Sequence, residues 1–132
     1  MFLGFGRAQV VILALIIFLG ACTVWLAYGS AQVSASNQKR LADIEQLQVV
    51  MNIFFKENGY YPYGQGTPNN FEPYLNSWPT PPKPTGSCTN QPNLYYYTPQ
   101  SSGDDYSIMF CLGTSTGGLR AGIHNASSKG IQ

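Results

Sequence analysis

Hydrophobic and polar positions divide the chain into three stretches with different patterns. Residues 10–28 form an almost continuous apolar run without a charged side chain. In residues 39–58, apolar positions recur at spacings of three and four, which is the period of an amphipathic helix. Residues 60–132 carry short aromatic and aliphatic runs separated by Gly- and Pro-rich segments. The pattern therefore predicts a helical first half followed by strands and turns.

The apolar run is long enough to cross a bilayer. As a helix, residues 10–28 would extend about 28 Å, close to the roughly 30 Å of hydrocarbon in a membrane. A secretory signal and a helix buried in an assembly are alternatives, and Leu19–Cys22 resembles a lipoprotein cleavage site. Residues 23–28 stay apolar, however, where a lipoprotein normally turns polar. We expect residues 1–30 to form a transmembrane or filament-core helix.

The amphipathic stretch predicts one helix face that packs on the rest of the protein. Six apolar side chains define this face: Leu41, Ile44, Leu47, Met51, Phe54 and Phe55. Four polar side chains are expected away from it: Lys39, Asp43, Gln46 and Lys56. Asp43 lies within helical reach of both Lys39 and Arg40. We therefore expect residues 31–59 to be an amphipathic helix that continues the apolar one.

The end of this helix is marked by Asn58–Gly59, because Gly readily adopts the left-handed conformation that closes a helix. Pro62 prevents any continuation. A continuous helix over residues 8–58 would be about 75 Å long, and a head of residues 60–132 is too small to cover it. We expect its first half to be buried in lipid or against other copies of the chain.

The remaining residues, 60–132, predict a loop-rich globular head. Residues 94–98 and 106–112 are the best candidate strands, joined by a turn over residues 99–105. Residues 117–125 predict a short third strand, or a segment that wraps the edge of the sheet. A three-stranded antiparallel sheet on the amphipathic helix would give an α+β fold. The Pro-rich residues 78–84 predict a stiff loop over the helix, or an exposed ligand for an aromatic groove.

Two of the three cysteines, Cys88 and Cys111, lie in this head. A disulfide between them would close a loop of about 24 residues and stabilise the head by about 3 kcal/mol. The alternative is two free thiols. Because disulfides persist in oxidising compartments, the bridge favours a head outside the cytoplasm.

Composition and motifs argue against catalysis and nucleic-acid binding. The net charge is +1 and only 10% of residues are charged, so no basic surface for nucleic acid is indicated. His124 is the only histidine, and no nucleophile motif accompanies it. Asp104 and Asp105 are adjacent carboxylates, but two ligands are too few to predict a calcium site. We expect no enzymatic activity, no cofactor and no bound metal.

Two segments carry a resemblance to a known family. Residues 38–48 (QKRLADIEQLQ) and residues 54–62 (FFKENGYYP) resemble type IV pilins and the pseudopilins of type II secretion. The resemblance covers residues 5–62, and residues 106–113 resemble the closing head strand of that family less specifically. It implies an apolar helix that continues into an amphipathic half and ends at an N-G-x-Y-P turn before a small β-sheet head.

The resemblance also implies processing by a prepilin peptidase, which usually cuts after a Gly. The first residue is then Phe or Met, and a Glu stands at the fifth position. Here no acidic residue precedes Asp43. Cleavage between Gly4 and Phe5 would place Gln9 at the Glu position, whereas Met1 as first residue would place Phe5 there. An uncleaved chain is the third alternative.

The function that the resemblance implies is that of a structural subunit of an extracellular type IV pilus-like filament. Its partners would be other copies of the chain, packed through their N-terminal helices, and the peptidase and ATP-driven assembly machinery of the inner membrane. The protein would reside in the inner membrane before assembly and on the cell surface afterwards. The alternative, favoured by the missing Glu, is a secretion pseudopilin or a monomeric membrane-anchored periplasmic module. We do not expect nucleic acid as a partner, although some filaments of this family take up DNA.

Overall fold

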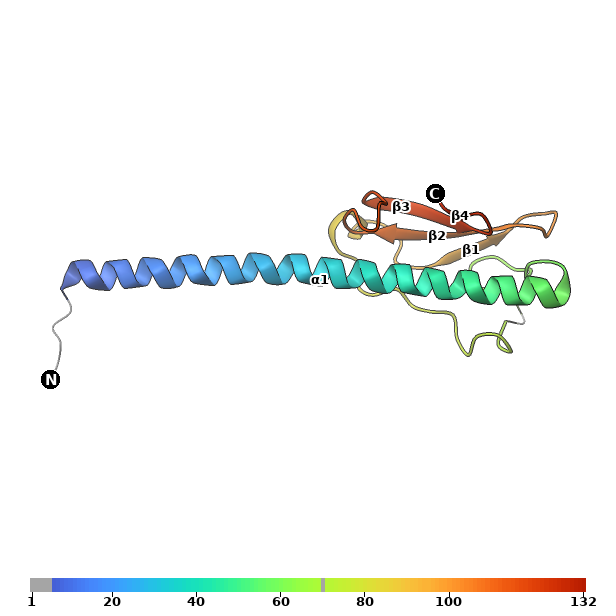
Figure 1. Ribbon diagram of the computed structural model, residues 1–132, viewed down its shortest axis with the longest axis horizontal. Helices are drawn as coiled ribbons and strands as arrows, with labels where there is room; N and C mark the ends of the chain where they lie inside the picture. Colours follow the sequence, from blue (N-terminus) through green and yellow to red (C-terminus); the bar gives the residue numbers. More distant parts are fainter. Residues whose placement is uncertain (1–5, 70) are drawn as a thin grey trace. The chain divides into compact units, whose positions relative to one another are not determined.

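The computed structural model describes residues 6–69 and 71–132, which form two units. The first unit ends at Gln32 and the second comprises Val33–Gln132. One helix, α1 (Arg7–Asn58), contributes to both (Figure 1). The expected processing positions Met1, Gly4 and Phe5 lie outside the described residues.

The beginning of α1 is capped by its own sequence. The side-chain Oε1 of Gln9 accepts the backbone N–H of Gly6 at 3.1 Å, and the Gln9 N–H donates to the Gly6 carbonyl at 2.8 Å. This is half of a capping box, in which the third helical residue reaches back to the amide that precedes the helix. Gln9 thus satisfies one backbone donor that the helix leaves unpaired.

The end of α1 confirms the predicted stop. Gly59 has a φ of 77° and donates its N–H to the carbonyl of Phe55 at 2.8 Å. The side-chain amide of Asn58 donates to the carbonyl of Phe54 at 2.9 Å. A residue with a Cβ would be strained at this φ, so glycine sets the position at which the chain leaves the helix.

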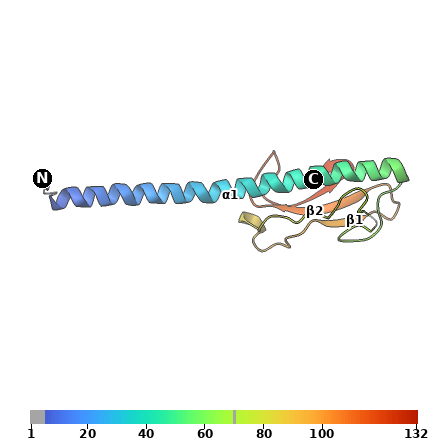
Figure 2. The ribbon, with the colours of Figure 1, turned by 90° about the horizontal axis from the view of Figure 1, so that it is seen from below.

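The second unit is an α+β head, as the pattern predicted. Its strands form one antiparallel sheet in the order β1-β2-β3-β4, and one side of this sheet lies along the second half of α1 (Figures 1 and 2). The strand bounds are β1 (Tyr96–Pro99), β2 (Tyr106–Leu112), β3 (Gly122–Ser127) and β4 (Gly130–Ile131), and a short 3-10 helix, η1, spans Gly86–Cys88.

The core lies between α1 and the sheet. Along β2, every second residue points to the core and is buried, from Tyr106 through Ile108 and Phe110 to Leu112. Aromatic rings fill much of the space: the centroids of Tyr61 and Tyr106 are 4.7 Å apart in an edge-to-face arrangement. Most of the tyrosine content of the chain is therefore used in packing this small head.

The predicted sheet was wrong in the number of its strands and in the limits of two of them. The sheet has four strands instead of three, because the C-terminal residues turn back and Gln132 exchanges two backbone hydrogen bonds with Asn125. β1 begins at Tyr96 instead of Leu94. β3 begins only at Gly122, since Gly117 and Gly118 take positive φ in a tight turn before it.

Both edges of the sheet offer few free backbone groups to another strand. At the β1 edge, Gly66 forms an isolated bridge with Tyr97, with N···O distances of 2.8 and 3.1 Å. The neighbouring Tyr95 carbonyl accepts the indole N–H of Trp78 at 2.9 Å. At the other edge, β4 has only two residues.

Candidate functional site

The first unit presents an apolar helix surface that none of its described residues covers. In α1, Trp25 is 83% exposed, and Ile17 and Val24 are each 70% exposed. An 18-residue window of this helix has a mean hydropathy of 2.8, and none of the window is buried. Within the described residues, α1 is the one helix long and apolar enough to cross a membrane.

Two hydroxyl groups of this surface are satisfied inside the helix. Thr23 donates to the Gly20 carbonyl at 2.8 Å, and Ser30 donates to the Ala27 carbonyl at 2.9 Å. Such back-bonding lets a hydroxyl sit in apolar surroundings without an unpaired donor. Cys22 is an exposed free thiol. The surface therefore suits lipid or other apolar helices better than water.

In the second unit, α1 contributes the apolar face that its periodicity predicted. Ile44, Leu47 and Met51 are fully buried and Phe54 is 7% exposed. Leu41 and Phe55 are partly buried against the same core. The ring of Phe55 stacks on Tyr61 at a centroid distance of 4.7 Å.

Asp43 was expected away from this face, and that prediction was wrong. Asp43 is only 4% exposed, and its Oδ2 accepts a hydrogen bond from the phenolic hydroxyl of Tyr95 at 2.9 Å. The Lys39 ammonium pairs with its other carboxylate oxygen from the solvent side. Burial and the hydrogen bond to Asp43 both raise the pKa of Tyr95, so this phenol stays a donor at all physiological pH values. The carboxylate is buried because it has these two partners.

Arg40 is a second buried polar residue on the helix, and the sequence did not reveal its burial. It is 1% exposed, and its Nη2 donates to the Pro82 carbonyl at 2.8 Å and to Asn93 Oδ1 at 2.9 Å. Burial lowers its pKa, which Tyr95 and Asp43 partly offset, and the guanidinium remains charged. Arg40 thereby fixes the Pro-rich loop of residues 78–84 on α1.

Asn37, fully buried, is the third polar anchor. Its Oδ1 accepts the backbone N–H of Gly113 at 2.8 Å, and its Nδ2 donates to the Thr114 carbonyl at 3.0 Å. The same Nδ2 lies 2.9 Å from the hydroxyl oxygen of Thr116. One amide therefore holds the loop that follows β2 against the first turns of the helix in this unit.

A disulfide joins Cys88 of η1 to Cys111 of β2, as the sequence suggested, with a Cα–Cα distance of 5.8 Å. The two segments approach so closely that a Cβ at Gly113 would lie 2.4 Å from the Thr85 carbonyl oxygen. Glycine is therefore required at this position. The Ser87 N–H donates to the Gly113 carbonyl at 2.9 Å and closes the contact.

The residues considered for metal binding and catalysis are engaged in the head itself. Asp105 Oδ1 accepts the backbone N–H groups of Tyr106 at 2.8 Å and Ser128 at 3.1 Å. In the part of the chain that the structure describes, no three His, Cys, Asp or Glu side chains gather into a possible metal site. His124 Nε2 lies 2.7 Å from the Arg120 carbonyl oxygen, and its ring packs on Phe110.

Asp104 accepts a hydrogen bond from the Ser102 hydroxyl in the exposed turn between β1 and β2. Burial acts to raise the pKa of Asp105, but the hydrogen bonds from Tyr106 and Ser128 and the nearby Lys129 ammonium outweigh it, so the net effect lowers this pKa. The Asp105 carboxylate is thus a structural acceptor that joins the β1–β2 turn to the β3–β4 turn.

Comparison with known proteins adds no relative: no protein-family model matches the chain, and no curated protein and no solved structure shows significant similarity to it.

Proposed function

We propose that this chain is a structural subunit of an extracellular filament of the type IV pilus kind. The observation that carries the proposal is the uncovered apolar half of α1, where large aliphatic and aromatic side chains are 46% to 83% exposed. In water such a surface is unfavourable by about 25 cal/mol for each Å² exposed. It requires lipid before assembly and neighbouring copies of the same helix afterwards.

The chemistry of the head is consistent with a non-cytoplasmic location. The disulfide between Cys88 and Cys111 persists in an oxidising compartment. Our proposal therefore places the head in the periplasm while α1 spans the inner membrane, and on the filament surface after assembly.

Transfer from lipid to filament replaces one apolar environment by another, so the gain rests on packing and is far smaller than transfer from water. Assembly then depends on an external source of work. The resemblance to pilins supplies a candidate for it, an ATP-driven machine in the inner membrane, and it implies a prepilin peptidase as the processing enzyme. The role of Gln9 in processing or assembly remains a prediction. Among the described residues, its side chain accepts a hydrogen bond from the Gly6 N–H.

The proposal is tested on filaments sheared from cells that produce the full chain. We expect electron microscopy to show thin fibres, and mass spectrometry of the sheared fraction to find this chain as their main component. Retention of all the protein in the inner-membrane fraction, with no fibre that contains it, would refute the proposal.

A matched pair of variants locates the assembly surface. Ile16 and Ile123 are both exposed aliphatic residues, at 61% and 47%, the first in the apolar half of α1 and the second on β3. We expect Ile16→Lys to abolish fibres, because a lysine in an apolar interface is unfavourable by about 2.5–3.5 kcal/mol. Ile123→Lys should leave them intact. Membrane-fraction levels of each variant, measured in parallel, separate failed assembly from failed insertion.

The second candidate is a pseudopilin or a monomeric membrane-anchored periplasmic module. One observation favours it: no acidic residue precedes Asp43, so the ion pair thought to guide pilin assembly has no carboxylate here. In that case the chain would stay in the inner membrane, and chemical cross-linking of intact cells would give only protomers or short oligomers.

A further inference from the structure

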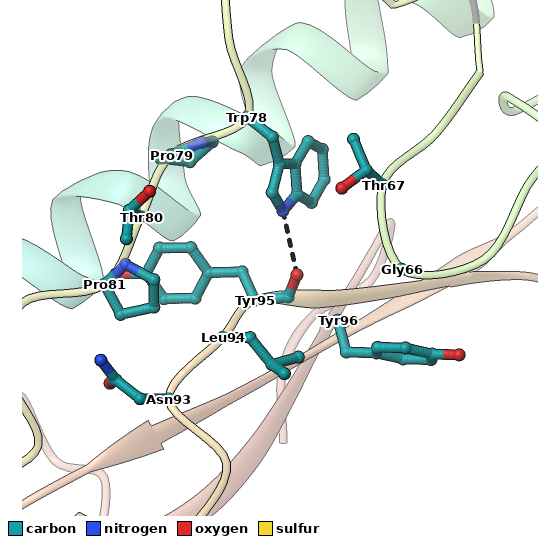
Figure 3. A pocket seen from close by; sticks show the side chains of 10 residues that line it. All are labelled: Gly66, Thr67, Trp78, Pro79, Thr80, Pro81, Asn93, Leu94, Tyr95 and Tyr96. Carbon is teal, nitrogen blue, oxygen red and sulfur yellow. Dashed lines mark hydrogen bonds between the residues drawn. The ribbon is translucent and has the colours of Figure 1, made fainter.

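The head contains a groove that the filament proposal does not use. It lies between the Pro-rich loop on one side and the chain leading into β1 on the other, and has a volume of about 470 Å³ (Figure 3). The lining residues come from three segments: Gly66, Thr67, Trp78, Pro79, Thr80, Pro81, Asn93, Leu94, Tyr95 and Tyr96. This volume lies in the range typical of sites for small ligands.

The two walls of the groove are tied together by hydrogen bonds. Trp78 on one wall donates its indole N–H to the Tyr95 carbonyl on the other (Figure 3). Arg40 donates both to the Pro82 carbonyl in the Pro-rich loop and to Asn93 Oδ1 in the chain that leads into β1. These three hydrogen bonds hold the two walls in place without a ligand, which reduces the ordering that binding would require.

The Trp78 side chain of the first wall is also held in place by aromatic contacts. The Trp78 ring packs edge-on against Phe71 and Tyr97, with centroid distances of 6.0 and 6.2 Å. Leu94 and Tyr96 remain 40% and 38% exposed, although they belong to a small head with many buried aromatic residues. Apolar side chains that stay accessible in a preformed concavity indicate a binding surface.

The polar groups of the groove are uncharged and have free hydrogen-bonding capacity. None of the lining residues carries a charge. Within the described residues, the hydroxyls of Thr67, Thr80 and Tyr96 make no hydrogen bond, and Asn93 uses its Oδ1 for Arg40 but leaves its Nδ2 free. A charged ligand would lose its hydration in this groove without gaining an opposite charge.

We infer that this groove binds a neutral saccharide. A sugar ring presents an apolar face of C–H groups, which matches accessible aromatic and aliphatic side chains. Its rim carries hydroxyls that both donate and accept, which matches the Thr and Tyr hydroxyls and the Asn amide of the groove. The inference concerns the head alone and does not depend on whether the chain forms filaments.

A proline-rich peptide is the main competing occupant, since aromatic grooves also bind polyproline helices. Such a peptide offers mostly carbonyl acceptors, so it would use the free hydroxyls of the groove only as donors and leave their acceptor capacity unused. The strongest donor at the groove, the indole N–H of Trp78, is already used by Tyr95. The hydroxyl-rich remainder favours a ligand that itself carries hydroxyls.

The test uses the full chain in a zwitterionic detergent without a sugar head group, because glycosidic detergents would compete. Saturation-transfer NMR is recorded with maltohexaose, cellohexaose and chitohexaose as neutral probes, heparin fragments as a charged probe and decaproline as a peptide probe. We expect saturation transfer to at least one neutral oligosaccharide. No transfer to any of them, or stronger transfer to heparin or decaproline, overturns the inference.

Two exposed groove residues and one matched tyrosine complete the test. We expect Tyr96→Ala to weaken binding of the neutral probe about tenfold, and Thr80→Val about fivefold, because each removes a contact without disturbing the core. Tyr63→Ala removes a tyrosine that is 62% exposed and does not line the groove, so binding should be unchanged. Weakening by Tyr63→Ala with no effect of Tyr96→Ala would place the site elsewhere and overturn the inference.

Discussion

The two halves of α1 use the same kind of side chain in opposite ways. In the first unit, aliphatic residues cover the helix on all sides and are exposed, as Leu26 is at 75%. In the second unit, one face of the helix buries most of them, as Leu47 is at 0%, while Val49 and Ile53 stay exposed at 58% and 44%. Buried polar residues accompany the second set, whereas in the first set the hydroxyls of Thr23 and Ser30 bond back to the helix.

This difference teaches how each half finds its partner. A helix that is apolar all round needs an apolar environment but specifies little about it. The head-bound half instead combines apolar burial with directional hydrogen bonds from Asn37, Arg40 and Asp43. Directional bonds select one arrangement of the loops, while apolar contact supplies most of the stability.

The largest expected effect separates two leucines of the same helix. Leu47→Ala should lower the free energy of unfolding of the head by about 2–5 kcal/mol, because it leaves a cavity in the core. Leu26→Ala should change it by less than about 0.5 kcal/mol, since that side chain has no partner within its unit. Urea unfolding of the full chain in detergent, followed by near-ultraviolet circular dichroism, measures both. Equal losses would contradict the contrast between the halves.

Removal of the disulfide should have the next largest effect. The Cys88→Ser/Cys111→Ser double variant is expected to lose about 3 kcal/mol, because the unfolded chain regains the freedom of the closed loop. Cys22→Ser is the control, and it should leave the unfolding curve unchanged. A double variant as stable as the parent protein would mean that the loop is held by its other contacts, chiefly Ser87 to Gly113.

The polar anchor of the helix predicts a smaller loss. Asn37→Ala removes the acceptor of the Gly113 N–H and leaves this buried donor unpaired, which should destabilise the head by about 1–3 kcal/mol. The neighbouring Gln38 is exposed, so Gln38→Ala should be neutral. The same unfolding assay applies, and hydrogen exchange at Gly113 should speed up only in the Asn37 variant.

The smallest effect concerns pH. Because the folded pKa of Asp105 is lowered, its carboxylate stabilises the head above the unfolded pKa of about 3.9, and this contribution is lost as the pH falls through that value and below. Asp105→Asn should flatten the difference in stability between about pH 7 and about pH 3. If the stability of Asp105→Asn still depended on pH as strongly as that of the parent protein, the pH dependence would come from other groups.

Local signals in the sequence predicted the elements that depend on local physics. The end of α1 follows from the glycine stop at Gly59, the limits of β2 from its aromatic and β-branched run, and the apolar face of the helix from spacing alone. The displaced start of β1 and the additional β4 depend on distant partners. Trp78 donates a hydrogen bond to the Tyr95 carbonyl, and the backbone of Gln132 pairs with that of Asn125.

The polar anchors were missed for the same reason. Asn37 and Gly113 are 76 residues apart, and Asp43 and Tyr95 are 52 residues apart. A charged residue beside an apolar stripe is read as solvent-exposed until its partner is known. The saccharide groove was also not foreseen, because its walls come from three segments that only the folded chain brings together.

The restricted sheet edges have a consequence for how copies of this protein can associate. An open edge strand is a template on which another chain can add a strand, and repeated addition leads to amyloid-like aggregates. Here Gly66 and Trp78 occupy backbone groups along one border, and the opposite border is two residues long. Addition of a strand from another head is therefore disfavoured at both borders, so close contact between heads does not by itself lead to backbone pairing.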